Sequence, residues 1–322
     1  MPVEPLLAKA PPEPVELGAY LAGLLLEDGY AFEPDLGDYA DLLDDRGART
    51  VRKHIRAAYA ENQEDGRARK LMESVAKAEG DVDTLIAIIA ADLDDRGLNH
   101  LRIARELDEA GRSDEALGWA GRGLREATNP DEQLVEYLAD RYVVAGRTDD
   151  VLSLRRARFE AERTLTSYQA LRRAAEDFGT WATERGQALA LLREDARHQR
   201  ARVPWAWSGP VLVDALLDDG DLDAAWAAAK YAATEDQWLR LADASAATCP
   251  ADALGLYLRA VGSLKKETGD PVYRRIASLL LSIRACHQAL NSTDQFKRYV
   301  AALRADQKRK RNLIKILDEN GL

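Results

Sequence analysis

Residues 110–117 read Ala-Gly-Arg-Ser-Asp-Glu-Ala-Leu, and 35 residues later positions 145–152 read Ala-Gly-Arg-Thr-Asp-Asp-Val-Leu. A looser copy, Asp-Gly-Asp-Leu-Asp-Ala-Ala-Trp, occupies residues 219–226. Each copy has a glycine that can end a helix in the left-handed conformation, then a polar turn, then a small apolar residue five positions after the glycine. This pattern predicts helical hairpins that recur along the chain.

One helical hairpin cannot bury its apolar stripe alone, whereas stacked hairpins bury it between them. The turn resembles that of a tetratricopeptide repeat, whose period is close to the observed offset. The match is degenerate, because His100, Ile103 and Ala104 stand where the repeat's early tryptophan, leucine and glycine are expected. We therefore predict an all-α fold, a right-handed α-solenoid of stacked antiparallel helical hairpins that is tetratricopeptide-like but irregular.

Composition and helix boundaries agree with this fold. Of the 322 residues 46% are apolar and only 7% aromatic, and strong helix formers dominate. Cys249-Pro250, Val203-Pro204, Thr128-Asn129-Pro130 and Gly269-Asp270-Pro271 each read as a helix start. The expected organisation is a proline-rich tail (1–14), an acidic helical segment (15–96), tetratricopeptide-like repeats (97–292) and a basic capping helix (293–322).

The net charge of −10 belongs to the first third of the chain. Residues 1–100 carry 21 acidic and 11 basic side chains, whereas residues 101–322 carry 34 of each. This asymmetry argues against a generally nucleic-acid-binding surface. Similar acidic stretches at residues 40–47 and 91–97 read as helix ends, with Gly47 and Gly97 at the exit and the carboxylates exposed to solvent.

The sequence predicts a cytoplasmic protein that contacts no membrane. Its two cysteines, Cys249 and Cys286, are too few for a disulfide framework. No run of 18 apolar residues exists, and the first residues lack the basic start of a signal peptide.

The residue patterns of common enzyme sites are not found in the sequence. There is no glycine-rich phosphate loop and no Gly-x-Ser-x-Gly elbow, and the four histidines lack metal-ligand spacing. Cys286 and His287 are adjacent, so their side chains do not share a helix face. We expect no catalytic, cofactor-binding or metal-binding residue and no enzyme activity; an enzyme with an unrecognised site between hairpins is the alternative.

Basic residues near the end of the chain are candidate partner contacts. Residues 297–322 hold eight basic and three acidic side chains. One helix would align four of the basic residues in a stripe and place two more beside it: Arg304, Lys308, Arg311 and Lys315, with Arg309 and Lys310. The stripe is read as a solvated cap of the stack, as a phosphate or acidic-partner contact, or as a contact to the acidic N-terminal segment.

Two tryptophans form a second candidate contact. Trp205 and Trp207 lie beside Pro204 and Pro210, in a loop or helix start between hairpins. They read either as packing between hairpins or as aromatic anchors for a protein partner.

From about residue 71 onward the chain resembles the C-terminal helical region of bacterial SWIM zinc-finger proteins, especially actinobacterial ones. The stretches that carry the resemblance are residues 101–107, 243–247, 251–254, 262–270 and, most clearly, 304–315. The family's zinc motif, Cys-x-Cys followed by Cys-x-His, is absent, so no zinc ligand carries over. The resemblance implies an association with DNA-handling machinery, although this implication depends mainly on the absent finger.

The sequence therefore favours a non-enzymatic scaffold that holds an unidentified protein partner on the concave face of a helical solenoid. The alternative is an accessory nucleic-acid-associated protein that contacts phosphates through its C-terminal basic helix.

Overall fold

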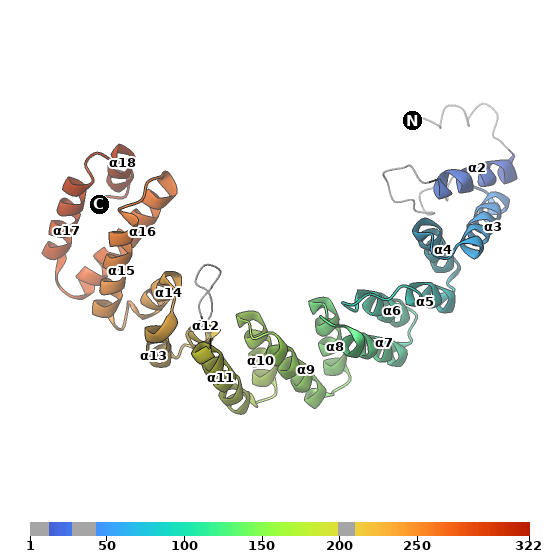
Figure 1. Cartoon of the computed structure of the whole chain (residues 1–322), viewed down its shortest axis with the longest axis horizontal. Helices are drawn as coiled ribbons and strands as arrows, with labels where there is room; N and C mark the ends of the chain where they lie inside the picture. Colours follow the sequence, from blue (N-terminus) through green and yellow to red (C-terminus); the bar gives the residue numbers. More distant parts are fainter. Residues whose placement is uncertain (1–12, 28–42, 199–209) are drawn as a thin grey trace. The chain divides into compact units, whose positions relative to one another are not determined.

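The computed structural model describes residues 13–27, 43–198 and 210–322, and every regular element in these ranges is an α-helix. The all-α prediction is confirmed, and successive helices pack against one another (Figure 1). The chain forms two compact units, Met1–Val151 (unit 1) and Leu152–Leu322 (unit 2), so the division falls inside one helix of the predicted repeat region.

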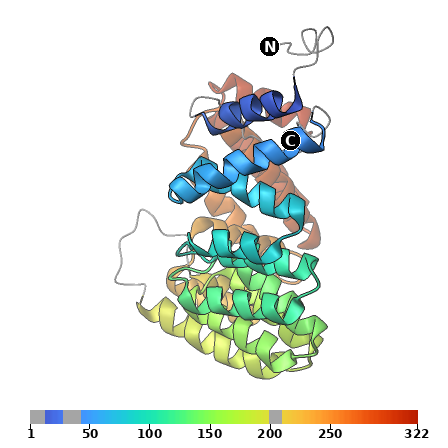
Figure 2. The same ribbon diagram turned by 90° about the vertical axis from the view of Figure 1, so that its right-hand side faces the viewer.

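Unit 1 contains stacked helices that follow one another from blue to green in Figure 2. Their bounds are α2 (Pro14–Leu26), α3 (Asp45–Glu61), α4 (Gly66–Glu79), α5 (Val82–Ala90), α6 (Leu98–Glu109), α7 (Ser113–Glu126) and α8 (Glu132–Val144). Helix α9 (Thr148–Ala161) spans the division.

Unit 2 continues with α10 (Leu165–Asp177), α11 (Trp181–His198), α12 (Val211–Asp218), α13 (Leu222–Ala232), α14 (Glu235–Ser245), α15 (Pro250–Leu264), α16 (Asp270–Ala289), α17 (Thr293–Asp306) and α18 (Arg311–Glu319).

The repeated glycines form the turns that their sequence predicts. Gly111, Gly146 and Gly220 have φ values of 74°, 67° and 72°. After each glycine, the next amide donates to a carbonyl five residues earlier: Arg112 to Leu107 (2.8 Å), Arg147 to Tyr142 (2.8 Å) and Asp221 to Leu216 (2.9 Å). This is the Schellman pattern, which needs a residue that tolerates positive φ.

The same turn also closes three hairpins that the repeated sequence did not reveal. After Gly80, Gly179 and Asn291, the next amide again bonds a carbonyl five residues earlier, at 2.8 to 2.9 Å. Asn291 has φ 52°, and asparagine is the usual substitute for glycine in this role. The six turns close the hairpins α4–α5, α6–α7, α8–α9, α10–α11, α12–α13 and α16–α17.

The acidic stretch that ends at Gly47 leads into a helix start, and residues 91–97 link the end of α5 to the start of α6. Neither glycine is a helix exit, which corrects that prediction. The Asp44 carboxylate accepts the amides of Arg46 (3.0 Å) and Gly47 (2.8 Å) at the start of α3. The Asp94 carboxylate accepts three amides at the start of α6, one from Arg96 and two from the first helical residues, Leu98 and Asn99. Aspartate oxygens satisfy the unpaired amides of a first turn and face the positive end of the helix dipole, so this position is the favourable one.

Replacing Asp94 by alanine is expected to cost about 1 kcal/mol of stability at pH 7. Burial raises the pKa of Asp94, but the three accepted amides outweigh it and hold the pKa below its usual value. A lowered folded pKa means that this stability is present above the unfolded pKa of about 4 and is lost as the pH falls through the folded value. Urea unfolding should therefore show a smaller cost at pH 3 than at pH 7. The exposed neighbour Asp95 supplies the control, and an Asp95→Ala cost equal to that of Asp94→Ala would contradict the assignment.

The other predicted helix starts differ in accuracy. Helix α15 begins as predicted, at Pro250, and α16 begins at Asp270, one residue before the predicted start at Pro271, with Gly269 as its N-cap. Helix α8 begins two residues later than predicted, because Asp131 is its N-cap and accepts the amide of Gln133. Val203-Pro204 lies outside the described residues.

Residues 293–322 form two helices, which corrects the prediction of one basic capping helix. Helix α17 ends at Asp306, and α18 begins at Arg311 after a turn in which the Lys310 amide donates to the Gln307 carbonyl (2.8 Å). The turn lets Leu313 and Leu317 of α18 reach the core of unit 2, where both are fully buried. Burying two leucines contributes several kcal/mol, which outweighs an uninterrupted helix.

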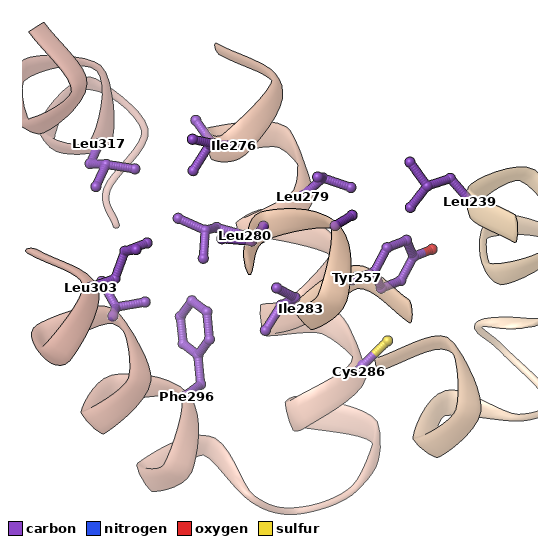
Figure 3. Close-up of a cluster of buried hydrophobic side chains, with 14 of the residues drawn as sticks. Leu239, Tyr257, Ile276, Leu279, Leu280, Ile283, Cys286, Phe296, Leu303 and Leu317 are labelled. Carbon is purple, nitrogen blue, oxygen red and sulfur yellow. The ribbon is translucent and has the colours of Figure 1, made fainter. Parts of the chain in front are cut away.

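The core of this end of unit 2 centres on α16. Leu280 and Ile283 are surrounded by Tyr257 of α15, Phe296 of α17 and Leu317 of α18 (Figure 3). The cluster joins α14 to α18, so the two terminal helices are held by apolar packing as well as by their turn.

Candidate functional site

Polar contacts in unit 2 join helices that are two apart in the chain. Gln169 of α10 donates to Asp218 at the end of α12 (2.7 Å), and Gln237 of α14 donates to Asp214 of α12 (3.1 Å). Asn312 of α18 donates to Asp270 of α16 (3.2 Å). These contacts place α10, α12 and α14 side by side, and α18 beside α16; we call this surface the alternate-helix face.

The first groove on the alternate-helix face lies between α10 and α12 and has a volume of about 290 Å³. Gln169, Arg172, Arg173, Glu176 and Asp218 line it. Arg172 donates to Glu176 (2.7 Å) and to Asp218 (3.2 Å). Arg173 is exposed and makes no hydrogen bond or ion pair within the described part of the chain. The groove therefore contains one fixed arginine and one that remains available.

The buried carboxylate of Asp219 links the helices that form the first groove. The Asp219 side chain is only 3% exposed and accepts from the Tyr168 hydroxyl (2.8 Å), from Arg185 and from Arg172 (3.3 Å). Burial raises the pKa of Tyr168, and its bond to the Asp219 carboxylate raises it further, so the phenol stays a proton donor. Arg185 also donates to Asp221 (2.8 Å), which ties α11 to the start of α13.

A second groove lies between α16 and α18 and has a volume of about 480 Å³. Its polar lining includes Arg274 and Ser278 from α16 with Lys315 and Glu319 from α18. The Lys315 ammonium lies 3.8 Å from the Glu319 carboxylate. Arg274 is exposed and, among the residues with described positions, has no hydrogen-bond or ion-pair partner. Both grooves thus present an unpaired guanidinium on the alternate-helix face.

The unpaired arginines make both grooves suitable for binding an acidic group. A guanidinium binds a carboxylate through two parallel hydrogen bonds, which makes an unpaired arginine a selective acidic-group receptor. Cys286 is buried, and burial raises the pKa of its thiol, which disfavours the nucleophilic thiolate. His287 bonds the Ser292 hydroxyl (2.8 Å). In the described ranges, no group of three or more His, Cys, Asp or Glu side chains could hold a metal ion.

Two of the six basic residues predicted as partner contacts make side-chain hydrogen bonds within the chain, and Lys315 is the third that has an internal partner. Arg304 donates to Asp318 and to the Leu322 carbonyl. The Lys310 ammonium donates to the carbonyls of Lys265 and Glu267, both at 2.6 Å. These contacts fix the terminal helices.

The other four candidates are exposed but do not form the predicted stripe. Lys308 and Arg309 lie in the turn before α18, Arg311 is the first residue of α18, and Lys315 lines the second groove. The side chains of Lys308, Arg309 and Arg311 make no hydrogen bond or ion pair to any residue whose position is described. Trp205 and Trp207, the predicted aromatic anchors, lie outside the described residues.

Sequence reasoning missed Arg173 and Arg274, because a single arginine on an amphipathic helix carries no distinguishing signal. Their significance comes from the neighbouring helix that completes each groove.

No helix within the described ranges is long and apolar enough to cross a membrane. Comparison of the sequence with models of known protein families and with curated proteins finds no match, so the function is inferred from the geometry and charge of the two grooves.

Proposed function

We propose that the chain is a non-enzymatic helical-repeat protein that binds an acidic segment of a partner protein along the alternate-helix face of unit 2. The observation that carries this proposal is the unpaired arginine in each groove, Arg173 between α10 and α12 and Arg274 between α16 and α18. Stacked helical hairpins commonly bind segments across successive repeats. This is a narrower form of the scaffold predicted from the sequence.

The mixed charge of the grooves supports a protein segment as the occupant. Glu176 and Asp218 line the first groove and Glu319 lines the second, beside the arginines. Carboxylates at these positions would repel a phosphate backbone, which carries negative charge throughout. A protein segment can offer carboxylates to the arginines and donors to the groove carboxylates.

We further propose a cytoplasmic location and a relation to the helical region of SWIM zinc-finger proteins. Cys249 is exposed and both cysteines are unpaired, which fits a reducing compartment. The relation is supported by the sequence stretches named above and by no other observation.

Reversing the two groove arginines, Arg173→Glu with Arg274→Glu, is expected to weaken partner binding about thirtyfold or more. Each charge-assisted hydrogen-bonded contact contributes about 2 kcal/mol, which corresponds to about thirtyfold in affinity. The measurement is affinity purification from nuclease-treated host lysate with quantitative mass spectrometry. Titration of the recovered partner's acidic segment against the purified chain follows.

The matched control is Arg193→Glu with Arg298→Glu, which makes the same charge change on exposed positions of α11 and α17. The control should bind as the unchanged chain does. Equal weakening in both variants would show a general charge effect and contradict the groove assignment, as would the absence of any specific partner.

A further inference from the structure

Two turns that are more than 40 residues apart in the chain meet at one end of unit 2. The Lys310 ammonium, in the turn before α18, donates to the carbonyls of Lys265 and Glu267, in the turn after α15. The Lys265 ammonium in return bonds the Asp306 carboxylate (3.0 Å). These reciprocal contacts hold the two turns together, so the side chains of both contribute to a single surface.

Four cations on these turns are exposed and unpaired. They are Lys266, Lys308, Arg309 and Arg311, which we call the basic ridge. None of these four side chains makes a hydrogen bond or ion pair with a residue in the described ranges. The nearby carboxylates of Asp306 and Asp270 are engaged, Asp306 by Lys265 and Gln307 and Asp270 by Asn312. Glu267, which is exposed, is the acidic residue in the turn that follows α15. Positive charge therefore dominates the basic ridge.

The start of α18 adds to this positive potential. Its N-cap, Lys310, makes no side-chain capping bond, and its first turn carries no acidic residue. The unpaired amides of a helix start favour anions. The start of α18 thus adds to the positive electrostatic potential of the basic ridge, and the four cations supply most of that potential.

The ridge lacks the apolar centre that a protein interface requires. Protein interfaces combine a polar rim with a hydrophobic core. The large exposed apolar residues in the described part of the chain, Val15, Tyr20, Val143, Val144 and Leu290, all belong to other segments. Tyr273, the aromatic residue beneath Lys310, is itself buried and cannot stack on a base. Positive charge without apolar or stacking surface suits phosphate groups, which are bound through charge and not through base stacking.

We propose that the basic ridge binds the phosphate backbone of a double-stranded nucleic acid without reading its sequence. Phosphate contacts position a protein but carry no sequence information. This surface is distinct from the two grooves and its occupant differs from that of the alternate-helix face. The chain's net charge of −10 makes the contact local and strongly dependent on salt.

The test is fluorescence anisotropy of a labelled 20-base-pair DNA duplex with the full chain between 50 and 200 mM salt. Four phosphate contacts predict a slope of log Kobs against log salt of about −3.5, which is a loss of about a hundredfold in affinity across this range. Reversing the ridge, Lys266→Glu, Lys308→Glu, Arg309→Glu and Arg311→Glu, is expected to abolish binding at 50 mM salt. Replacing the same four residues by glutamine should flatten the slope, because each lost phosphate contact reduces it by about 1.

The control variant is Arg193→Glu, Lys230→Glu, Lys297→Glu and Arg298→Glu, which changes net charge equally at exposed positions elsewhere in unit 2. Circular dichroism checks that each variant is folded, and the glutamine variant replaces the glutamate variant in the comparison if the latter does not fold.

Retained duplex binding by the control variant supports the assignment to the basic ridge. Equal loss in ridge and control variants, or no duplex binding by the unchanged chain, overturns the proposal. Ridge-dependent binding of polyglutamate without duplex binding also overturns it, in favour of an acidic protein. Arg173→Glu with Arg274→Glu should leave duplex binding intact, so this proposal and the proposed function fail separately.

Discussion

Replacing Leu280 by alanine should destabilise unit 2 by about 3 kcal/mol. Leu280 lies on α16 in the middle of the cluster that joins α14 to α18, and its exposed fraction is 0% (Figure 3). The substitution removes buried apolar surface and leaves a cavity that close-packed neighbours fill only in part. Hydrogen exchange measured by mass spectrometry should show opening of α14 to α18 about a hundredfold more often, with α4 to α7 of unit 1 unchanged.

Leu290→Ala provides the comparison for this substitution, because Leu290 is 38% exposed just after α16. Its cost should stay below about 1 kcal/mol. Equal destabilisation of units 1 and 2 by Leu280→Ala would contradict the division of the chain into two compact units.

Replacing Asp219 by alanine should destabilise the α10–α12 region by about 3 kcal/mol. The substitution removes the acceptor shared by Tyr168, Arg185 and Arg172 and leaves the Tyr168 hydroxyl without its partner. Tyr168 is fully buried, so its hydroxyl cannot replace that bond with water at no cost. Urea unfolding followed by tryptophan fluorescence measures the loss.

Asp218→Ala is the matched control, because Asp218 is the neighbouring aspartate but lies at the surface of the first groove. Its contacts to Gln169 and Arg172 are exposed, and such contacts contribute about 1 kcal/mol or less. If Asp219→Ala and Asp218→Ala have the same free energy of unfolding, the hydrogen bonds to Asp219 do not stabilise the first groove. Weaker partner binding by the stable Asp218→Ala variant would support a direct role for the groove surface.

The hairpin turns could be predicted because their cause is local. At Gly111, Gly146 and Gly220, both the positive φ and the closing hydrogen bond lie within six consecutive residues. The Asn291 turn obeys the same rule but was missed because its residue type differs. The pattern of a residue that tolerates positive φ, followed by a polar residue, would have found it.

The acidic stretches show the limit of local reasoning. Asp44 and Asp94 are followed within three residues by Gly47 and Gly97, and the glycines suggested helix exits. In the structure, the glycines are instead closely packed against other segments of the chain. A Cβ at Gly47 would lie 2.9 Å from the Pro14 carbonyl oxygen, and one at Gly97 would lie 2.7 Å from Leu134. The glycines serve close packing, and the aspartates cap the helices that follow.

The sequence by itself determined that the chain is helical, where three of the six hairpin turns lie, and that basic residues gather near its end. It could do so because helix propensity, glycine conformation and charge are properties of short segments. Only the tertiary structure decided that residues 307–310 form a turn, since the burial of Leu313 and Leu317 depends on a core supplied by α14 to α17. It also brought Lys310 against the turn of Lys265 and Glu267, and it gave Arg173 and Arg274 their grooves. These positions depend on packing between helices distant in the chain, and no local pattern specifies that packing.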